Sequence, residues 1–104
     1  MASVVETLKA ARKRIERGWC QGQQAVDGEG SGVAPHDDDA VAWCLVGSTA
    51  AERSAVLSWA ADDVLHRVLG RPLVCWNDEP GRTQADVLAL FDHAISLAEA
   101  EAQR

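Results

Sequence analysis

Residues 83–103 read TQADVLALFDHAISLAEAEAQ, and this stretch decides the fold class. Thr83 and Asp86 have the spacing of a capping box, in which a hydroxyl and a carboxylate each accept a hydrogen bond from an unpaired amide at the start of a helix. Apolar residues then recur three and four positions apart, which is the period of one helix face. The stretch therefore predicts a long amphipathic helix that ends near residue 103. Its apolar face consists of Val87, Leu90, Phe91, Ala94, Leu97 and Ala98.

Residues 3–17 predict another amphipathic helix at the start of the chain. Ser3 and Glu6 have the spacing of a capping box, and apolar residues follow with helical period. Gly18 is expected to end this helix in the left-handed conformation that glycine adopts most easily. Residues 19–36 hold four of the eight glycines and are expected to form a solvated loop.

The central part of the chain predicts two more helices. Residues 40–46 are apolar on every side, so a helix that starts at residue 37 or 38 and ends near 47–48 should be buried, with Trp43 or Leu45 in the core. Thr49 and Glu52 form a third capping-box pattern, which predicts a helix over 50–69.

The segment that follows is expected to be extended and then to turn. Gly70 and Pro72 prevent the preceding helix from continuing, so residues 71–76 are expected to be extended. Residues 77–81 read NDEPG, a composition typical of turns. We predict an all-α chain, a compact bundle of four helices in a single domain over residues 1–104. A short two-stranded pairing of residues 19–21 with 73–76 is expected beside it.

Charge and composition limit the function. The chain of 104 residues has room for one core, and its formal net charge is −6. Residues 1–17 carry five basic and two acidic residues, whereas the rest of the chain carries five basic and fourteen acidic ones. An acidic body repels a phosphate backbone, so we expect no direct nucleic-acid binding. The chain shows neither a signal-peptide pattern nor a membrane-spanning stretch, which predicts a cytoplasmic protein.

Three cysteines, each beside a tryptophan, are the candidate metal ligands. Cys20, Cys44 and Cys75 could form a zinc site together with His36. Their spacings of 24 and 31 residues lack the close ligand pairs that structural zinc sites contain. We therefore expect no metal, no other cofactor and no disulfide bond. The neighbouring tryptophans, Trp19, Trp43 and Trp76, are expected to pack in the core.

A thiol enzyme is the alternative interpretation of the same residues. Catalysis by a cysteine needs a thiolate beside an imidazole. Cys20 or Cys75 could be the nucleophile, His66 the base, and Asn77 or Asp78 the group that orients it. A set of this kind can be found in almost any chain with three cysteines and three histidines, so it is a weak signal.

Three stretches carry a resemblance to a known family. They are residues 18–22 (GWCQG), 42–47 (AWCLVG) and 76–88 (WNDEPGRTQADVL). Together they resemble a family of short, functionally uncharacterised proteins of bacteria and their phages. The resemblance spans residues 18–95 and implies no activity, cofactor or catalytic residue. It implies that the first and last stretches form one structural unit, with structural roles for Trp19, Trp43, Trp76, Asn77, Asp78 and Thr83.

The function that we expect from the sequence is protein binding. A small acidic cytoplasmic domain without a catalytic pattern fits an accessory or regulatory protein, for example a phage-derived inhibitor of a host system. Its partner would be a protein, and a homodimer is compatible with the sequence. The alternatives are a small cysteine-dependent hydrolase or transferase and, with less support, an acidic mimic of nucleic acid.

Overall fold

The computed structural model describes residues 3–103, and within them the chain forms five helices and two short strands. The strands, β1 and β2, form an antiparallel pair in which Ala25 lies opposite Trp43 and Val26 opposite Ala42. The chain is thus mostly helical, as predicted, although it has one helix more than predicted. The elements in order are α1 (Val4–Arg17), β1 (Ala25–Val26), β2 (Ala42–Trp43), α2 (Leu45–Ala50), α3 (Ala55–Leu69), α4 (Leu73–Asn77) and α5 (Gln84–Ala102).

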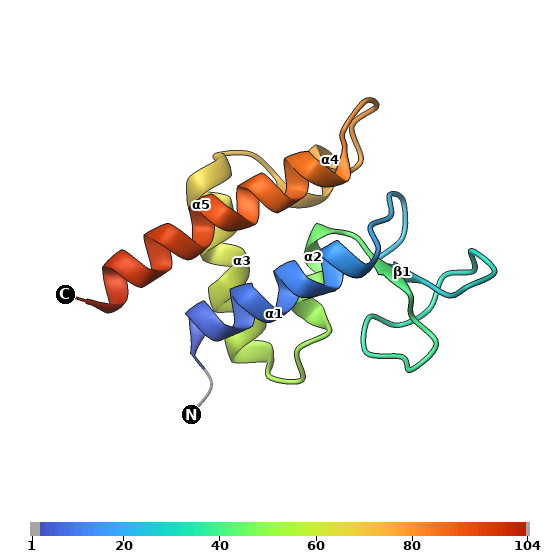
Figure 1. Ribbon diagram of the computed structural model, residues 1–104, viewed down its shortest axis with the longest axis horizontal. Coiled ribbons are helices and arrows are strands. Elements are labelled where there is room, and N and C mark those ends of the chain that lie inside the picture. The colour runs from blue at the N-terminus through green and yellow to red at the C-terminus, as the bar shows by residue number, and fades with distance from the viewer. Residues whose placement is uncertain (1–2, 104) are drawn as a thin grey trace.

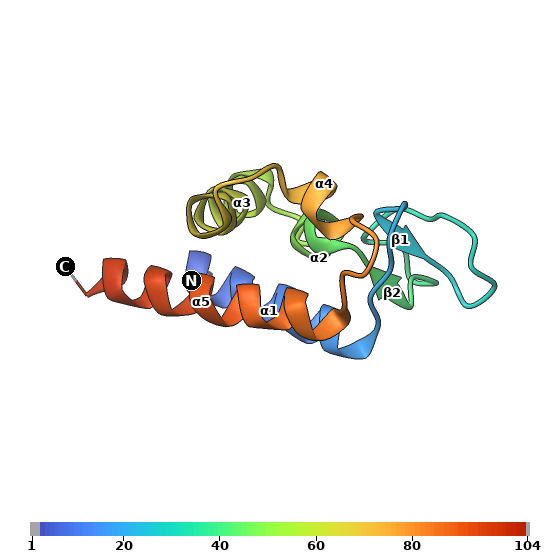
Figure 2. The same ribbon diagram turned by 90° about the horizontal axis from the view of Figure 1, so that it is seen from above.

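The helices lie in two layers. Figure 1 shows α1 and α5 running in opposite directions, and Figure 2 shows them side by side in one layer, with α2, α3 and α4 in the other. The long segment between α1 and α2, which contains the two strands, lies at one end of the molecule in both views. This end holds most of the irregular structure and is where α1 ends and α5 begins.

The core lies between these layers and contains the residues that the helical patterns predict. Leu8 and Ile15 of α1 and Phe91 of α5 have no exposed surface. Trp43 and Leu45 are also buried, with 5% and 0% of their surface exposed, which confirms the prediction for this apolar stretch. Most of the predicted face of α5 is buried, and its capping box is formed between Thr83 and Asp86.

The predicted helix that starts at residue 37 or 38 is wrong. Asp37 accepts a hydrogen bond from the amide of Asp39 (2.8 Å) in a local turn, and residues 42–43 form β2. Helix α2 begins only at Leu45, after Cys44 in extended conformation. The strand pairing with β1, in the segment predicted to be loop, satisfies backbone groups that a helix would have used.

The start of the third predicted helix is also wrong. Helix α3 begins at Ala55, because the Ser54 hydroxyl caps it by accepting the Leu57 amide at 3.2 Å. The Thr49 hydroxyl does not act as an N-cap. It donates instead to the Asp62 carboxylate (2.6 Å) inside the molecule.

The predicted pairing of residues 19–21 with 73–76 is not formed. Residues 73–77 are helix α4, which follows Pro72, whose φ of −57° suits the start of a helix. Trp19 forms an isolated parallel bridge with Trp43 instead. The two segments still meet, but through side-chain hydrogen bonds that are described below.

Gly18 ends α1 for a different reason from the one predicted. Its φ of −178° is extended rather than left-handed. A Cβ atom at this position would lie 2.2 Å from the carbonyl oxygen of Val41, so only glycine permits the close approach of the chain after α1 to β2. Gly70, at the end of α3, adopts the left-handed conformation, with φ of 73°. None of the helices within residues 3–103 is long and apolar enough to span a membrane.

The burial of Leu45 gives a first prediction. Replacement of Leu45 by alanine should lower the free energy of unfolding by about 2–5 kcal/mol, because it leaves a cavity where no solvent reaches. Urea denaturation measures this loss. Leu88→Ala is the matched control, since Leu88 is only partly buried, and its loss should be clearly smaller. Equal losses for the two variants would contradict this description of the core.

Candidate functional site

The side chain of Asn77, at the end of α4, joins three segments of the chain. It is fully buried. Its Oδ1 accepts hydrogen bonds from the indole Nε1 of Trp19 (2.8 Å) and the amide of Leu45 (3.0 Å). Its Nδ2 donates to the carbonyl of Cys20 (3.2 Å) and to the carboxylate of Asp78 (2.9 Å). The amide group thereby uses both acceptor positions and both donors.

Further hydrogen bonds fasten the segment after α1 to the turn after α4. Gln21 Nε2 donates to the carbonyl oxygens of Asn77 (2.9 Å) and Glu79 (3.0 Å). The amide of Gly22 donates to the Asp78 carboxylate (3.0 Å). The two stretches that the sequence analysis joined into one unit are therefore in direct contact, although neither pairs with the other as a strand.

Arg82 contacts Trp76 and the turn that follows α4. Its guanidinium lies over the Trp76 ring, 4.0 Å from the centroid, and its Nε donates to the Trp76 carbonyl at 2.9 Å. It also forms ion pairs with Glu79 (2.8 Å) and Asp86 (3.8 Å). Trp76 is buried beneath it. These contacts fasten Arg82 to Trp76 and to the turn that follows α4, and the structural role of Trp76, Asn77 and Asp78 stays a prediction that is tested below.

Two of the three thiols lie against this unit and are poor nucleophiles. Burial raises the pKa of the Cys20 thiol to about 11, and the nearby Cys44 and Asp78 act in the same direction. Cys44 is the N-cap of α2, where its Sγ accepts the Gly47 amide at 3.3 Å. Burial raises the pKa of Cys44 also, although the hydrogen bond from Gly47 opposes this. Both thiols therefore stay protonated at neutral pH.

The predicted base lies away from this cluster. A cavity of about 280 Å³ borders Cys44 and Asp78, but no histidine lines it. His66 is exposed on α3. The two carboxylates near it on α3 have other partners: Asp62 accepts the Thr49 hydroxyl (2.6 Å), and Asp63 accepts Arg67 (3.1 Å). The structure brings Cys20, Asn77 and Asp78 together, without an imidazole to activate the thiol.

The candidate metal ligands are also dispersed. Among residues 3–103, no three or more His, Cys, Asp or Glu side chains are close enough together to hold a metal ion. Cys75 is exposed on α4, whereas Cys20 is half-buried and Cys44 is buried. His36 lines a different cavity, beside Trp59.

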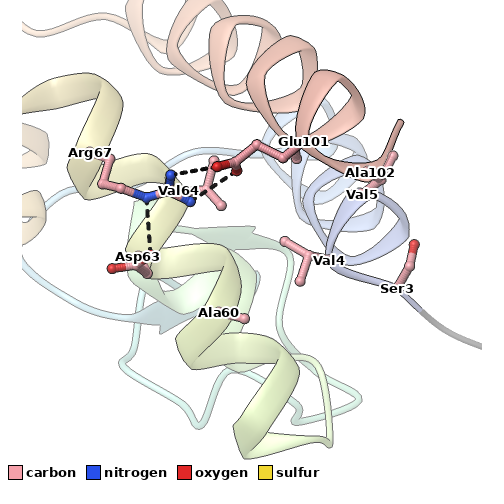
Figure 3. Close-up of a pocket in the computed structure, with 10 residues that line it drawn as sticks. Ser3, Val4, Val5, Ala60, Asp63, Val64, Arg67, Glu101 and Ala102 are labelled. Atoms are coloured by element: carbon pink, nitrogen blue, oxygen red, sulfur yellow. Dashed lines mark hydrogen bonds and ion pairs between the residues drawn. The ribbon is translucent and has the colours of Figure 1, made fainter. Parts of the chain in front are cut away.

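An apolar groove of about 440 Å³ lies where α1 begins, α3 passes and α5 ends (Figure 3). Arg67 spans one side of it, donating to Glu101 at 2.8 Å and to Asp63 at 3.1 Å. The charged groups around the groove are thus bonded to one another, and its floor offers only apolar contact. The apolar lining consists of Val4, Val5, Ala60, Val64, Ala98 and Ala102.

The first turns of α3 carry an exposed apolar surface of a different kind. Val56 and Trp59 lie about one turn apart, with 71% and 69% of their surfaces exposed. A cavity of about 490 Å³ lies beside Trp59 and is also lined by His36, Glu52 and Arg53. We call these five residues the Trp59 face. A tryptophan exposed to this degree leaves a large apolar area in water, which is typical of a protein interface.

The Trp59 face was not predicted, because only the three tryptophans beside cysteines were considered. The helical period holds the signal that could have found it. Asp63 and His66 follow Trp59 by four and seven positions, so the three side chains share one side of the helix. That side is polar apart from the tryptophan, and the core stripe with Ala61 and Leu65 lies on the other.

The chain belongs to a family of unknown function, DUF6197, whose model matches residues 1–97. This match confirms the expected membership of a functionally uncharacterised family. No curated protein and no solved structure matches the chain. The geometry of the described residues is therefore the basis for a functional proposal.

The hydrogen bonds of Asn77 give a second prediction. Asn77→Ala should lower the free energy of unfolding by about 2–5 kcal/mol, because the half-buried indole N–H of Trp19 and the buried amide of Leu45 lose their acceptor. Thr83→Ala, which removes an exposed helix cap, should cost about 1 kcal/mol. Urea denaturation of both variants compares the two losses. An Asn77→Ala variant as stable as Thr83→Ala would show that the amide is not a structural centre.

The thiols give a third prediction. Labelling with iodoacetamide at pH 7 should modify the exposed Cys75 first and Cys20 slowly. Because the pKa of Cys20 is raised to about 11, its thiolate fraction and labelling rate should rise about tenfold per pH unit between pH 7 and 9. A Cys75→Ser variant isolates the Cys20 signal in mass spectra. Labelling of Cys20 that is rapid and independent of pH above 7 would instead indicate an activated nucleophile.

Proposed function

We propose that the chain is a small, non-catalytic protein-binding domain of the cytoplasm, and that its partner docks on the Trp59 face. The observation that carries this proposal is the exposure of Trp59, 69% of whose surface is in contact with solvent. Buried at an interface, such a ring contributes more binding free energy than most side chains. A role as an accessory or regulatory protein, for example a phage-encoded inhibitor of a host system, is the specific form of the proposal.

The position of Trp59 on a packed helix supports this role. Helix α3 is held in the core by Ala61, Val64 and Leu65, all buried. Trp59 is therefore presented from a rigid element, and a partner that binds it does not have to order a loop. This favours docking over a merely accidental exposure of one apolar residue.

The charges around Trp59 define the partner's chemistry. Arg53 forms no hydrogen bond or ion pair within residues 3–103, and it lines the cavity beside the ring. We therefore infer a partner protein with an apolar pocket for Trp59 and an acidic group that meets Arg53. A second copy of the chain suits this surface less well, because two copies with a net charge of −6 repel each other.

The other functions considered for this chain have less support. A cysteine-dependent hydrolase or transferase needs an activated thiolate. The pKa of the Cys20 thiol is raised to about 11, and the cavity that Cys44 lines contains no histidine. Mimicry of nucleic acid needs a regular acidic surface. Lys9 and Arg12 instead neutralise acidic groups of α5, at Glu99 and Asp92.

A comparison of capture by two variants tests the proposed interface, and is our fourth prediction. Tagged wild-type protein and a Val56→Ser, Trp59→Ser double variant are used as baits in a lysate of the organism that encodes the chain. We expect at least one protein that is enriched by the wild type and lost with the double variant. The affinity of that protein, once purified, should fall at least about 100-fold, since hot-spot residues contribute 2 kcal/mol or more each.

Val74→Ser is the matched control. Val74 is also an exposed valine, on α4 rather than on α3. This variant should retain the partner with unchanged affinity. The proposal is wrong if every captured protein binds the double variant as well as the wild type. It is also wrong if sedimentation shows a homodimer that the double substitution abolishes, because the face would then bind a second copy.

A further inference from the structure

The basic residues of the chain are divided between two environments. Nine of the ten lysines and arginines lie within residues 3–103, and five of these nine form salt bridges with carboxylates. Three of the other four, Arg14, Arg17 and Arg53, line a single pocket. The fourth, Lys13, does not line it. The three arginines without a carboxylate partner within residues 3–103 are thus gathered at one place in an acidic protein.

This arginine pocket has a volume of about 250 Å³ and lies where α1 ends, against the segment before β2 and the residues after α2. Arg14 donates one hydrogen bond to the Ser48 carbonyl (2.9 Å). The Arg17 guanidinium is placed over the ring of Trp43, 5.4 Å from its centroid. An arginine has five N–H donors, so most donors of Arg14 and all those of Arg17 and Arg53 have no protein acceptor within residues 3–103.

The pocket concentrates positive charge that is only partly neutralised. Burial lowers the pKa of Arg14, Glu52 opposes this, and the nearby charge of Arg17 lowers it further. Asp37 and Asp38 also line the pocket. Neither forms an ion pair with an arginine within residues 3–103, and Asp37 accepts the amide of Asp39 instead. A bound anion would remove the repulsion among the arginines and accept their free donors.

We propose that the arginine pocket binds the phosphoryl group of a phosphorylated ligand. A phosphoryl group carries close to two negative charges and three strong acceptor oxygens, which matches three guanidinium groups. A carboxylate carries only one negative charge and would neutralise less of the charge of three guanidinium groups. The ligand is either a free phosphate compound or a phosphorylated side chain. The pocket shares Arg53 with the Trp59 face. The inference does not rest on the proposed protein partner, because phosphate binding is measured on the chain alone.

Titration with inorganic phosphate tests the pocket directly. The ¹⁵N-labelled protein is titrated at constant ionic strength, with sodium phosphate replacing sodium chloride, and the arginine Nε–Hε resonances are recorded by NMR. We expect saturable shifts of the Arg14, Arg17 and Arg53 signals, and none for Arg71, which is paired with Glu79. Acetate at the same concentration should produce no saturable shift. Shifts that are absent, or equal with acetate, would overturn the proposal.

Substitutions then separate a built site from general attraction. Arg53→Gln should weaken phosphate binding about tenfold or more, because the loss of one charge-assisted hydrogen bond changes the dissociation constant by at least about that factor. Lys13→Gln removes the same charge from α1 outside the pocket and should leave binding unchanged. Asp38→Asn removes a lining carboxylate and should strengthen binding. Equal weakening by Arg53→Gln and Lys13→Gln would show a non-specific effect and overturn the proposal.

Folding and ligand source are controlled in the same series. Arg53 bonds to no other described side chain, so Arg53→Gln should melt at the wild-type temperature, and this is measured for each variant. N-acetyl-O-phosphoserine amide is titrated beside inorganic phosphate. Tighter binding of the phosphoserine compound indicates a phosphorylated side chain as the ligand, and equal binding indicates a free phosphate compound. Binding of neither compound contradicts the proposal.

Discussion

The buried side-chain amide of Asn77 is the constraint on which the irregular end of the molecule depends. It accepts hydrogen bonds from the Trp19 indole and from the Leu45 amide, and it donates to the Cys20 carbonyl. Backbone hydrogen bonds join the segment after α1 to Trp43. The end of α4 is fastened to both of these segments by the Asn77 side chain, which is fully buried. At a buried position a polar group that loses its partner is costly, which makes the arrangement sharply defined. These hydrogen bonds fix the positions of the segments around Asn77.

The effect of this constraint reaches the arginine pocket through α2. Asn77 bonds the first residue of α2, Leu45, and the same short helix presents the Ser48 carbonyl to Arg14. Trp43, at the end of β2, has the Arg17 guanidinium over its ring and donates a hydrogen bond to the Pro35 carbonyl (2.8 Å). The residues that could bind a ligand are thus placed by those that hold the fold. The Cys44 thiol belongs to the same arrangement, because its Sγ accepts the Gly47 amide at the start of α2.

The sequence predicted what local periodicity controls and missed what long-range contacts decide. The face of α5, its capping box and the burial of Leu45 follow from spacing and composition alone. The apolar run that contains Trp43 predicted a helix, but its backbone pairs with residues 25–26, and no local pattern reveals that partner. The segment that forms α4 lies between a proline and a turn, and these neighbours suit an extended chain equally well. The arginine pocket was missed because the packed structure alone brings Arg14, Arg17 and Arg53 together. The exposure of the Trp59 ring also depends on packing, although the helical period places it on the polar side of α3.

The two sides of α1 explain how an acidic protein keeps one cationic pocket. On the side that faces α5, Lys9 and Arg12 are neutralised by Glu99 and Asp92. Arg14 and Arg17 project elsewhere, toward a segment whose carboxylates do not reach them. The net charge of −6 repels large polyanions over a distance comparable to the Debye length, roughly 8–10 Å at physiological salt. Contacts inside the pocket act at a much shorter range. A negative net charge is therefore compatible with the proposed binding of one small anion, because the two interactions operate at different distances.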